Sequence, residues 1–435
     1  MKDALLAKIQ DGSAVVAVVG LGYVGLPLAR HFIDAGHHVI GVDTAADRVA
    51  MLLRGECPLG HLPGDWVAPA VASGHFAPTT DFGMLADADA VVICVPTPLT
   101  AHREPDLSHV RAAAEAAARS LRPGQLVVLE STTWPGTTEE VLLPLLLARG
   151  LEVGSGFFLA FSPEREDPGN RAYSLGDIPK VVGGVTDACT EAAAALYGRV
   201  CARVVPVSRP AAAELAKLLE NVFRSVNIAL VNELKMLCDR MGLDVWEIID
   251  AAATKPFGFM PFYPGPGLGG HCIPIDPFYL TWKAREYGFS TRFIELSGEI
   301  NTSMPHYVVT RVMEALNDRG KTLRNARVLV LGAAYKADVN DLRESPALRL
   351  MELLREKGAV VRYNDPHVPR LDHGPVSLES TPLSAEELAA SDCVLVATAH
   401  AAYDPDFIVQ YASLVVDTRN MTRHVTRHRD RIVRA

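Results

Sequence analysis

The stretch from Ala14 to Asp43 constrains the fold of this chain more than any other. It contains an apolar run at 14–19, the turn Gly20-Leu21-Gly22-Tyr23-Val24-Gly25, a helical pattern to Ala35 and a second apolar run at 38–42. Continuous apolar, β-branched runs of this kind are typical of strands buried on both faces of a parallel sheet. A glycine-rich turn between such a strand and a helix lets a pyrophosphate approach the helix N-terminus. We therefore expect a dinucleotide-binding unit here.

Asp43 indicates which dinucleotide is bound. It follows the last glycine of the turn by 18 residues, at the end of the second strand. An acid at this position is placed to bind the ribose diol. The same acid disfavours a 2′-phosphate, so the sequence predicts NAD rather than NADP.

Three further apolar runs end in polar or turn-forming residues. The run 90–95 is followed by Pro96 and Thr97, the run 126–130 by Ser131 and Thr132, and the run 157–161 by Ser162, Pro163 and Glu164. The carboxyl ends of strands line the ligand crevice of a doubly wound sheet, so the hydroxyl groups should face the dinucleotide. An acid at such an end is a candidate acid/base group. The local alternatives are plain turn chemistry and a solvated loop charge.

A long helix is predicted over 211–240, where no proline or glycine occurs and apolar residues recur at helical spacing before Gly242. Roughly 30 residues at 1.5 Å each give about 45 Å, which exceeds one small domain. We expect this helix to bridge two sheet domains and to supply a subunit interface. Lys217 and Asn221, four residues apart, share one face near its start. A solvated lysine and a surface asparagine are the alternative.

The glycine-rich segment 264–277 carries a single cysteine, Cys272. Its glycines allow close approach to a bound group, which a connecting loop rarely requires. Asp276 and Pro277 are read as the N-cap and first residue of a helix that ends at Gly288. Cys272 would then precede a helix N-terminus, where the dipole favours the thiolate. The alternative is a buried, inert cysteine in a tight turn.

The last third repeats an α/β pattern without a second glycine fingerprint. Strands are predicted at 327–331, 360–363, 393–397 and 414–416, with a helix from Ser345-Pro346 to Gly358. Basic residues lie near the strand ends, and they suit a diphosphate other than that of the dinucleotide. Scattered surface ion pairs are the alternative. These basic residues are Lys336, Arg343 and Arg419.

Length and composition exclude several classes of protein. A chain of 435 residues should form two or three domains, and its net charge of −9 without a clustered basic face argues against nucleic acid as a partner. Seven cysteines, with no CxxC pair and no zinc-ligand spacing, favour a reducing compartment and no metal site. No segment has the length of a signal peptide core or membrane span, so we expect a soluble, cytoplasmic protein.

Taken in order, the motifs resemble those of the UDP-glucose/GDP-mannose dehydrogenase family of nucleotide-sugar C6 dehydrogenases. They are GLGYVGLPLA, VPTPL, ESTTWPGTT, SPEREDPGN, AKLLENVFRSVNIALVNEL, GPGLGGHCIPIDP, GAAYKADVNDLRESPA and DTRN. The resemblance implies an α/β fold with two Rossmann-like doubly wound parallel-sheet domains joined by a central helical domain. It places the NAD-binding domain at 1–205, the central domain at 206–305 and the nucleotide-sugar domain at 306–435. It also implies a homodimer formed through the long helix and a place in polysaccharide biosynthesis.

The resemblance further implies a four-electron oxidation of the sugar C6 alcohol to a carboxylate with two NAD per turnover. Cys272 would be the nucleophile that forms a thiohemiacetal and then a thioester. Lys217 and Asn221 would stabilise oxyanions and order water, and Glu164 would assist thioester hydrolysis. Asp276 matches the family's acid four residues after the cysteine.

Binding positions carried over from the family fall into two sets. The cofactor set is Gly20, Gly22, Tyr23, Val24, Gly25, Asp43, Arg48, Pro96, Thr97, Ser131, Thr132 and Arg343. The substrate set is Glu164, Arg165, Lys217, Asn221, Tyr263, Gly267, Gly269, Lys336 and Arg419.

Local departures from the UDP-glucose pattern bear on the sugar. The run Glu164-Arg165-Glu166-Asp167-Pro168-Gly169 and the histidine before Cys272 look more like the UDP-N-acetylglucosamine 6-dehydrogenase branch. UDP-glucose and dTDP-glucose stay open as substrates, because a few pocket residues can decide specificity. A two-electron β-hydroxyacid-type dehydrogenase and a non-catalytic nucleotide-sugar-binding protein are further alternatives.

Overall fold

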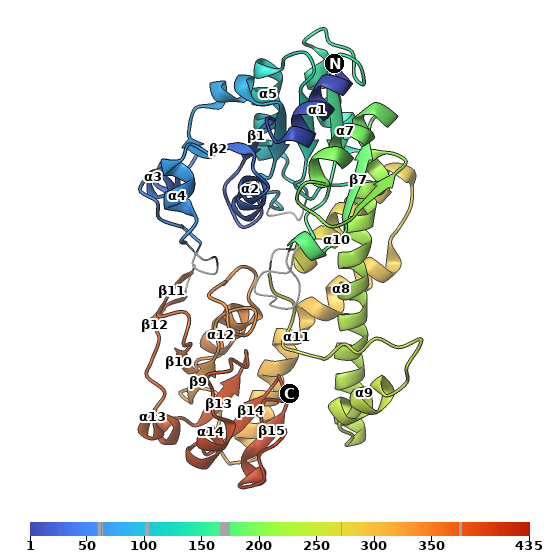
Figure 1. The fold of residues 1–435 in the computed structure, drawn as a ribbon. Coiled ribbons are helices and arrows are strands. Elements are labelled where there is room, and N and C mark those ends of the chain that lie inside the picture. The colour runs from blue at the N-terminus through green and yellow to red at the C-terminus, as the bar shows by residue number, and fades with distance from the viewer. Residues whose placement is uncertain (60–61, 63, 101–103, 166–174, 271, 374–375) are drawn as a thin grey trace. The chain divides into compact units, whose positions relative to one another are not determined.

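The apolar runs of the sequence form the buried strands of two sheets in the computed structural model of the chain (Figure 1). The structure describes residues 1–59, 62, 64–100, 104–165, 175–270, 272–373 and 376–435. The chain divides into a first unit, Met1–Glu220 with Phe278–Phe289, and a second unit, Asn221–Pro277 with Ser290–Ala435.

The described α-helices and strands alternate through most of both units. The helices are α1 (Lys2–Asp11), α2 (Gly25–Asp34), α3 (Ala46–Leu53), α4 (Val67–Ala72), α5 (Ser108–Ser120), α6 (Leu143–Leu147), α7 (Asp187–Tyr197), α8 (Pro210–Met241), α9 (Val245–Ala253), α10 (Cys272–Ala284), α11 (Arg292–Asn317), α12 (Pro346–Glu356), α13 (Ala385–Ala390) and α14 (Pro405–Tyr411). The strands are β1 (Val15–Val19), β2 (His38–Val42), β3 (Phe76–Thr79), β4 (Ala90–Ile93), β5 (Leu126–Leu129), β6 (Phe158–Phe161), β7 (Lys180–Gly184), β8 (Val204–Val207), β9 (Arg327–Leu331), β10 (Val360–Asn364), β11 (Arg370–His373), β12 (Val376–Glu379), β13 (Cys393–Val396), β14 (Val415–Asp417) and β15 (Ile432–Arg434).

The sheet of the first unit has the order β3-β2-β1-β4-β5-β6-β7-β8. All its neighbours pair in parallel except β6 and β7, which run antiparallel with Ala160 opposite Gly184. The order reverses between β1 and β4, as it does in doubly wound sheets. The α/β fold expected from the sequence is therefore confirmed, and the antiparallel step is a feature that the sequence did not predict.

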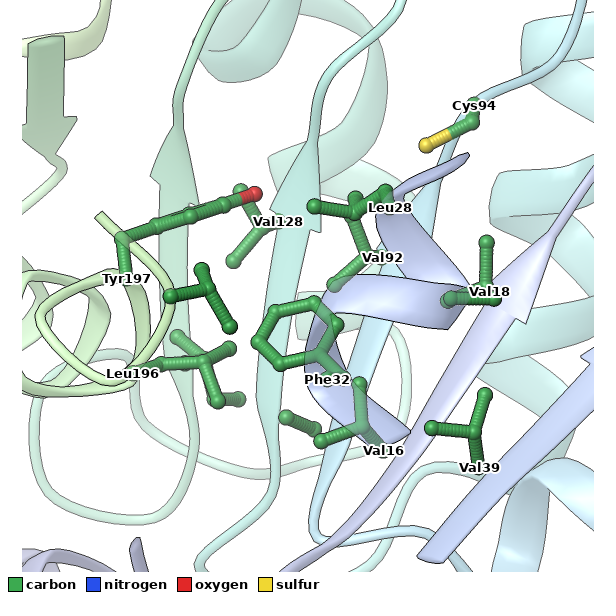
Figure 2. Close-up of a cluster of buried hydrophobic side chains, with 14 of the residues drawn as sticks. Val16, Val18, Leu28, Phe32, Val39, Val92, Cys94, Val128, Leu196 and Tyr197 are labelled. Carbon is green, nitrogen blue, oxygen red and sulfur yellow. The ribbon is translucent and has the colours of Figure 1, made fainter. Parts of the chain in front are cut away.

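Helices α1, α2 and α7 supply the apolar side chains that cover one face of this sheet. Figure 2 shows Phe32 of α2 beside Val16 of β1, with Leu196 and Tyr197 of α7 on its other side. The rings of Phe32 and Tyr197 are 6.3 Å apart between centroids. Burial of such side chains contributes about 1.5–3 kcal/mol each, so the packing of these helices on the sheet stabilises the first unit.

The second unit contains a five-stranded parallel sheet of order β10-β9-β13-β14-β15. Its strands alternate between two cores. Val328 and Val330 of β9 pack with α11 and α12, whereas Leu329 and Leu331 pack with α13 and α14. Burial on both faces explains why these strands appear as unbroken apolar runs in the sequence.

The long helix was predicted correctly, and α8 spans 32 residues. The predicted start of the helix after the cysteine was wrong. Helix α10 begins at Cys272, so Asp276 is not its N-cap and Pro277 lies inside it. A proline inside a helix removes one backbone hydrogen bond and crowds the carbonyl four residues before it, so other contacts of the segment offset that cost. The helix ends as expected before Gly288, which adopts a φ of 63°.

Candidate active site

The three glycines of the first turn each meet a different local requirement. Gly20 has a φ of 94°, and Gly25 lies so close to the turn that an added Cβ would stand 1.8 Å from the Gly20 carbonyl oxygen. An added Cβ at Gly22 would meet nothing within 4 Å. The turn thus needs Gly20 for its conformation, Gly25 for close packing of α2 on the turn, and Gly22 only if a bound group fills the open space.

Asp43 is buried at the end of β2 and is already part of a hydrogen-bond network. Its Oδ2 accepts hydrogen bonds from the Leu21 N–H and from Arg48, each at 2.8 Å, and its Oδ1 accepts one from the Ala45 N–H. These contacts fix the carboxylate beside the glycine turn. Arg48, expected to touch the cofactor, orients the acid in the structure.

Ser131, Thr97 and Pro96 lie at the carboxyl ends of β4 and β5, as expected. The Ser131 hydroxyl donates to the Val95 carbonyl at 2.7 Å, so it links the two strand ends. The Thr97 carbonyl accepts a hydrogen bond of 2.9 Å from the hydroxyl of Tyr279. Thr133, two residues beyond Ser131, has a buried hydroxyl without a hydrogen-bond partner among the described residues. Such a group is usually satisfied by bound water or ligand.

Glu164 is buried beyond the end of β6, and both of its carboxylate oxygens have partners. Oε1 accepts from the Arg165 N–H at 2.6 Å, and Oε2 lies 3.3 Å from the ammonium group of Lys180. The Arg165 guanidinium forms an ion pair of 2.6 Å with Glu220 of α8. Glu220 lies three residues after Lys217 on α8, so the Arg165–Glu220 ion pair lies within one helical turn of the predicted Lys217.

Lys217 and Asn221 are both buried on α8, which excludes the alternative of solvated surface residues. Lys217 belongs to the first unit and Asn221 to the second. The Asn221 amide donates a hydrogen bond of 2.5 Å to Asp276 Oδ2. Asp276 is 2 % exposed and lies one turn after Cys272 on α10. The structure therefore brings two predicted catalytic residues into direct contact.

The glycines of the segment 264–270 are packed tightly against the second sheet domain. An added Cβ at Gly265 would stand 2.4 Å from the Arg419 guanidinium, and one at Gly269 would stand 2.6 Å from Tyr335. The Gly270 N–H donates to the Arg343 carbonyl at 2.9 Å. Small residues here let the backbone reach the segments that carry Arg343, Lys336 and Arg419.

The side chains expected to bind cofactor or substrate in the second unit make contacts of their own. Arg419 donates to the Ala397 carbonyl at 2.9 Å, and burial lowers the pKa of its guanidinium to about 10. Arg343 forms an ion pair with Asp341, and the Tyr263 hydroxyl donates to Asp250 at 2.7 Å. The expected contacts of these residues with ligands stay predictions, as do those of Tyr23, Val24, Thr132, Gly267 and Lys336.

One group of described residues has the composition of a metal site. Asp338, His367 and His400 place potential ligand atoms within 4.8 Å of one another. His400 is fully engaged by the protein, because Nδ1 accepts from the Asp338 N–H and Nε2 contacts Asp365, each at 3.0 Å. That use of both ring nitrogens favours a structural role. The expectation of no metal stays a prediction.

Sequence models of one family match nearly the whole chain. The NAD-binding domain of the UDP-glucose/GDP-mannose dehydrogenase family matches residues 14–201, its central domain residues 211–303, and its UDP-binding domain residues 329–424. The chain belongs to this family. It is an NAD-dependent nucleotide-sugar dehydrogenase, and its substrate is a nucleotide sugar.

Relatives with different sugar names are about equally similar. The NDP-N-acetyl-D-galactosaminuronic acid dehydrogenase of Ralstonia nicotianae is 37% identical, covering 93% of this chain and 96% of the relative. The UDP-N-acetyl-D-glucosamine 6-dehydrogenase of Pseudomonas aeruginosa is 36% identical, covering 89% and 91%. The structure of the UDP-D-ManNAc dehydrogenase of Pyrococcus horikoshii superposes with a TM-score of 0.85 at 32% identity, covering 94% and 96%.

The first turn fits the NAD that the family implies. An added Cβ at Gly22 would meet no atom within 4 Å, which leaves the turn open to a pyrophosphate, and the buried Asp43 carboxylate lies at the strand end where dinucleotide-binding folds place an acid for the ribose diol. Among the described residues, no helix has the length and apolar content to cross a membrane.

Sequence reasoning missed several buried polar residues near these positions. Glu130, Lys180 and Tyr197 form a network with Glu164, and Glu214 lies one turn before Lys217 on α8. Burial raises the pKa of Glu214 to about 7, although Thr138 donates hydrogen bonds to it from its hydroxyl and its N–H. The available signal was Glu130 directly after the apolar run 126–129, and a charge at that position also fits a solvated turn.

Proposed function

We propose that the chain oxidises the C6 hydroxymethyl group of a nucleotide-diphosphate hexose to a carboxylate through a covalent intermediate on Cys272. The buried Asn221–Asp276 pair, one turn beyond Cys272 on α10, is the observation that supports this most directly. A pair of this kind fixes the Asn221 amide, whose second N–H can then donate to an oxygen of the substrate. We also propose the three-domain division at 1–205, 206–305 and 306–435.

The position of Cys272 suits a nucleophile. As the first residue of α10 it lies at a helix N-terminus, where the dipole favours the thiolate. Bound NAD supplies the acceptor for the hydride lost from C6 in each oxidation. The thiolate adds to the C6 aldehyde, and the resulting thiohemiacetal loses a second hydride to become a thioester. Water then cleaves the C–S bond, which releases the carboxylate and restores the thiol.

Two groups on α8 and one beyond β6 would assist these steps. The ammonium group of Lys217 and the Asn221 amide donate hydrogen bonds to the negative oxygen that develops on C6. Glu164 takes a proton from the water that attacks the thioester. Its two anchored oxygens hold the carboxylate in one orientation, which favours proton transfer from a single direction.

The favoured substrate is UDP-N-acetylglucosamine. The sequence around Cys272 and the acid loop after β6 support this choice, as does the similarity to a relative named for that sugar. Relatives named for N-acetylgalactosaminuronic acid and N-acetylmannosamine are similar to the same degree, so these 2-acetamido sugars belong in the test.

Counting NADH per sugar tests the reaction. We expect two NADH and one carboxylate product per UDP-N-acetylglucosamine consumed, and lower kcat/KM for the N-acetylgalactosamine, N-acetylmannosamine, glucose and dTDP-glucose analogues. One NADH with an aldehyde or ketone product would identify a two-electron dehydrogenase. A silent panel would favour a binding protein that lacks the chemistry.

The variant Cys272→Ser tests the nucleophile. We expect carboxylate formation to fall by at least about a hundredfold while NAD binding persists, because the serine hydroxyl is a much weaker nucleophile at neutral pH. Cys57→Ser is the matched control, since Cys57 is a free cysteine outside the motifs. Wild-type turnover by Cys272→Ser would disprove the assignment.

We further propose that α8 forms a homodimer interface with a second copy of the chain. Six apolar side chains at helical spacing are exposed on this one helix, which is more than solvent-facing helices usually carry. We expect Leu230→Lys to convert dimer to monomer in sedimentation velocity, whereas Arg224→Glu, at an exposed position of the same helix outside this stripe, is the control. A dimer that survives Leu230→Lys would contradict this interface. The six residues are Leu215, Leu219, Phe223, Leu230, Leu237 and Met241.

A further inference from the structure

The antiparallel step in the first sheet brings three charged residues to one place. Because β6 and β7 run in opposite directions, the first residue of β7 lies beside the end of β6. That first residue is Lys180, and Glu164 follows β6 by three residues. Glu130 follows directly after β5, the parallel neighbour of β6. All three belong to the first unit.

Lys180 contacts both acids in a site that is nearly closed to solvent. Its ammonium group forms an ion pair with Glu130 Oε1 and a second contact of 3.3 Å with Glu164 Oε2. Tyr197 donates a hydrogen bond of 2.7 Å to the other oxygen of Glu130. Lys180 and Glu130 are each 1 % exposed, so neither charge is stabilised by water.

The charges in this network do not balance when all three groups are ionised. One cation faces two carboxylates, and Glu164 is the acid at the more exposed end of the network. Burial alone would lower the pKa of Lys180, but the negative charges of Glu130 and Glu164 override it and raise that pKa. Burial raises the pKa of Glu130 to about 7, and Lys180 opposes this effect. Lys180 therefore stays protonated, and its single ammonium group contacts both carboxylates.

We propose that Lys180, held in place by Glu130, is a positioning residue that keeps Glu164 in its carboxylate form and fixes one of its oxygens for the hydrolysis step. The inference rests on the proposed role of Glu164 as general base. A nearby cation favours the carboxylate, and a nearby second carboxylate disfavours it. Lys180 and Glu130 thus act on the pKa of Glu164 in opposite directions.

The test is the pH dependence of kcat for carboxylate formation in three variants of the full-length enzyme. Lys180→Met removes the cation, so we expect the acidic limb of the profile to move to higher pH by about one unit or more. Glu130→Gln removes the competing acid, so we expect the limb to move to lower pH. Tyr197→Phe is the matched control, because it removes one hydrogen bond of the network without changing a charge. Because that hydrogen bond lowers the pKa of Glu130, the limb of Tyr197→Phe should move less than that of Glu130→Gln.

Opposite shifts in the two charge variants support the inference, whereas shifts in the same direction or no shift overturn it. Thermal unfolding and NAD binding establish whether each variant is folded. If Lys180→Met does not fold, Glu130→Gln decides alone. If neither folds, the network is structural and the inference fails.

The variant Glu164→Gln separates this inference from the proposed function. If Glu164→Gln removes the acidic limb while the two charge variants leave it unmoved, only the role of Lys180 is refuted. If Glu164→Gln retains wild-type hydrolysis and the wild-type limb, the general-base role of Glu164 is refuted.

Discussion

Two alanine substitutions in the first turn should both weaken NAD binding, but only one of them should destabilise the fold. Gly22 and Gly25 lie three residues apart, yet their surroundings differ. An added Cβ at Gly22 meets open space, whereas one at Gly25 stands 1.8 Å from the Gly20 carbonyl oxygen and 3.1 Å from Val18 Cγ1. The same added methyl group therefore tests ligand space at one position and backbone packing at the other.

For Gly25→Ala, the nearest atom belongs to the backbone and has to move by more than 1 Å to reach an ordinary contact distance. Overpacking of this kind costs about 1–3 kcal/mol and displaces the turn. We expect a lower unfolding temperature for the ligand-free protein, together with loss of NAD binding.

For Gly22→Ala, the φ angle is compatible with alanine and no atom is displaced, so the free energy of unfolding should change by less than about 1 kcal/mol. The methyl group occupies the space assigned to the pyrophosphate. We expect the Kd for NAD to rise roughly tenfold or more, which corresponds to about 1.4 kcal/mol.

Differential scanning fluorimetry without ligand and isothermal titration with NAD measure the two effects separately. Wild-type NAD affinity of a folded Gly22→Ala protein would show that the pyrophosphate does not lie over Gly22. A Gly25→Ala protein with wild-type stability would show that α2 does not pack against the turn as described.

Two further predictions concern buried carboxylates. Asn221→Asp places a second acid 2.5 Å from Asp276, which raises the pKa of one member of the pair, so the native state holds a proton that the unfolded state releases. The free energy of unfolding in urea should therefore fall between pH 5 and pH 8 more in Asn221→Asp than in Asn221→Ala. An equal pH dependence in the two variants would refute the contact. The pKa of Asp365 is lowered, because hydrogen bonds from His400 and backbone N–H groups outweigh the effect of burial. Its stabilisation is present above pH 3.8 and is lost as the pH falls through the lower native pKa, so Asp365→Asn should flatten this part of the acid-unfolding curve, and an unchanged curve would contradict it.

The sequence predicted those parts of the fold that local spacing determines. The first βαβ segment was predicted because its apolar runs and glycine spacing are local signals, and Gly20 and Gly25 have steric reasons within a few residues, such as the close approach of Gly25 to Gly20. Both faces of β9 are covered, so its apolar run was recognisable without knowledge of its neighbours. Helix α8 was predicted for a similar reason, since its length excludes strand and loop alternatives.

The start of α10 could not be predicted from local signals. Asp276-Pro277 has the pattern of an N-cap and first helical residue, yet the helix begins at Cys272. The Asp276 side chain accepts a hydrogen bond from Asn221, which is 55 residues away in the chain. A distant partner therefore determined the role of this acid, and the capping pattern alone gave the wrong boundary.

The network around Lys180 is the clearest case of a site feature that depends on topology. Its contacts join residues 16, 50 and 67 positions apart in the sequence, and the reversed direction of β7 is what places Lys180 beside Glu164. With β7 parallel to β6, its first residue would lie near the start of β6 instead of its end, and Lys180 would not contact Glu130 or Glu164. Glu130 would then be a buried carboxylate without a cation. Loss of one partner from a buried ion pair costs several kcal/mol. The antiparallel step and the paired acids therefore require each other, and this links the topology of the sheet to the proposed state of the catalytic base.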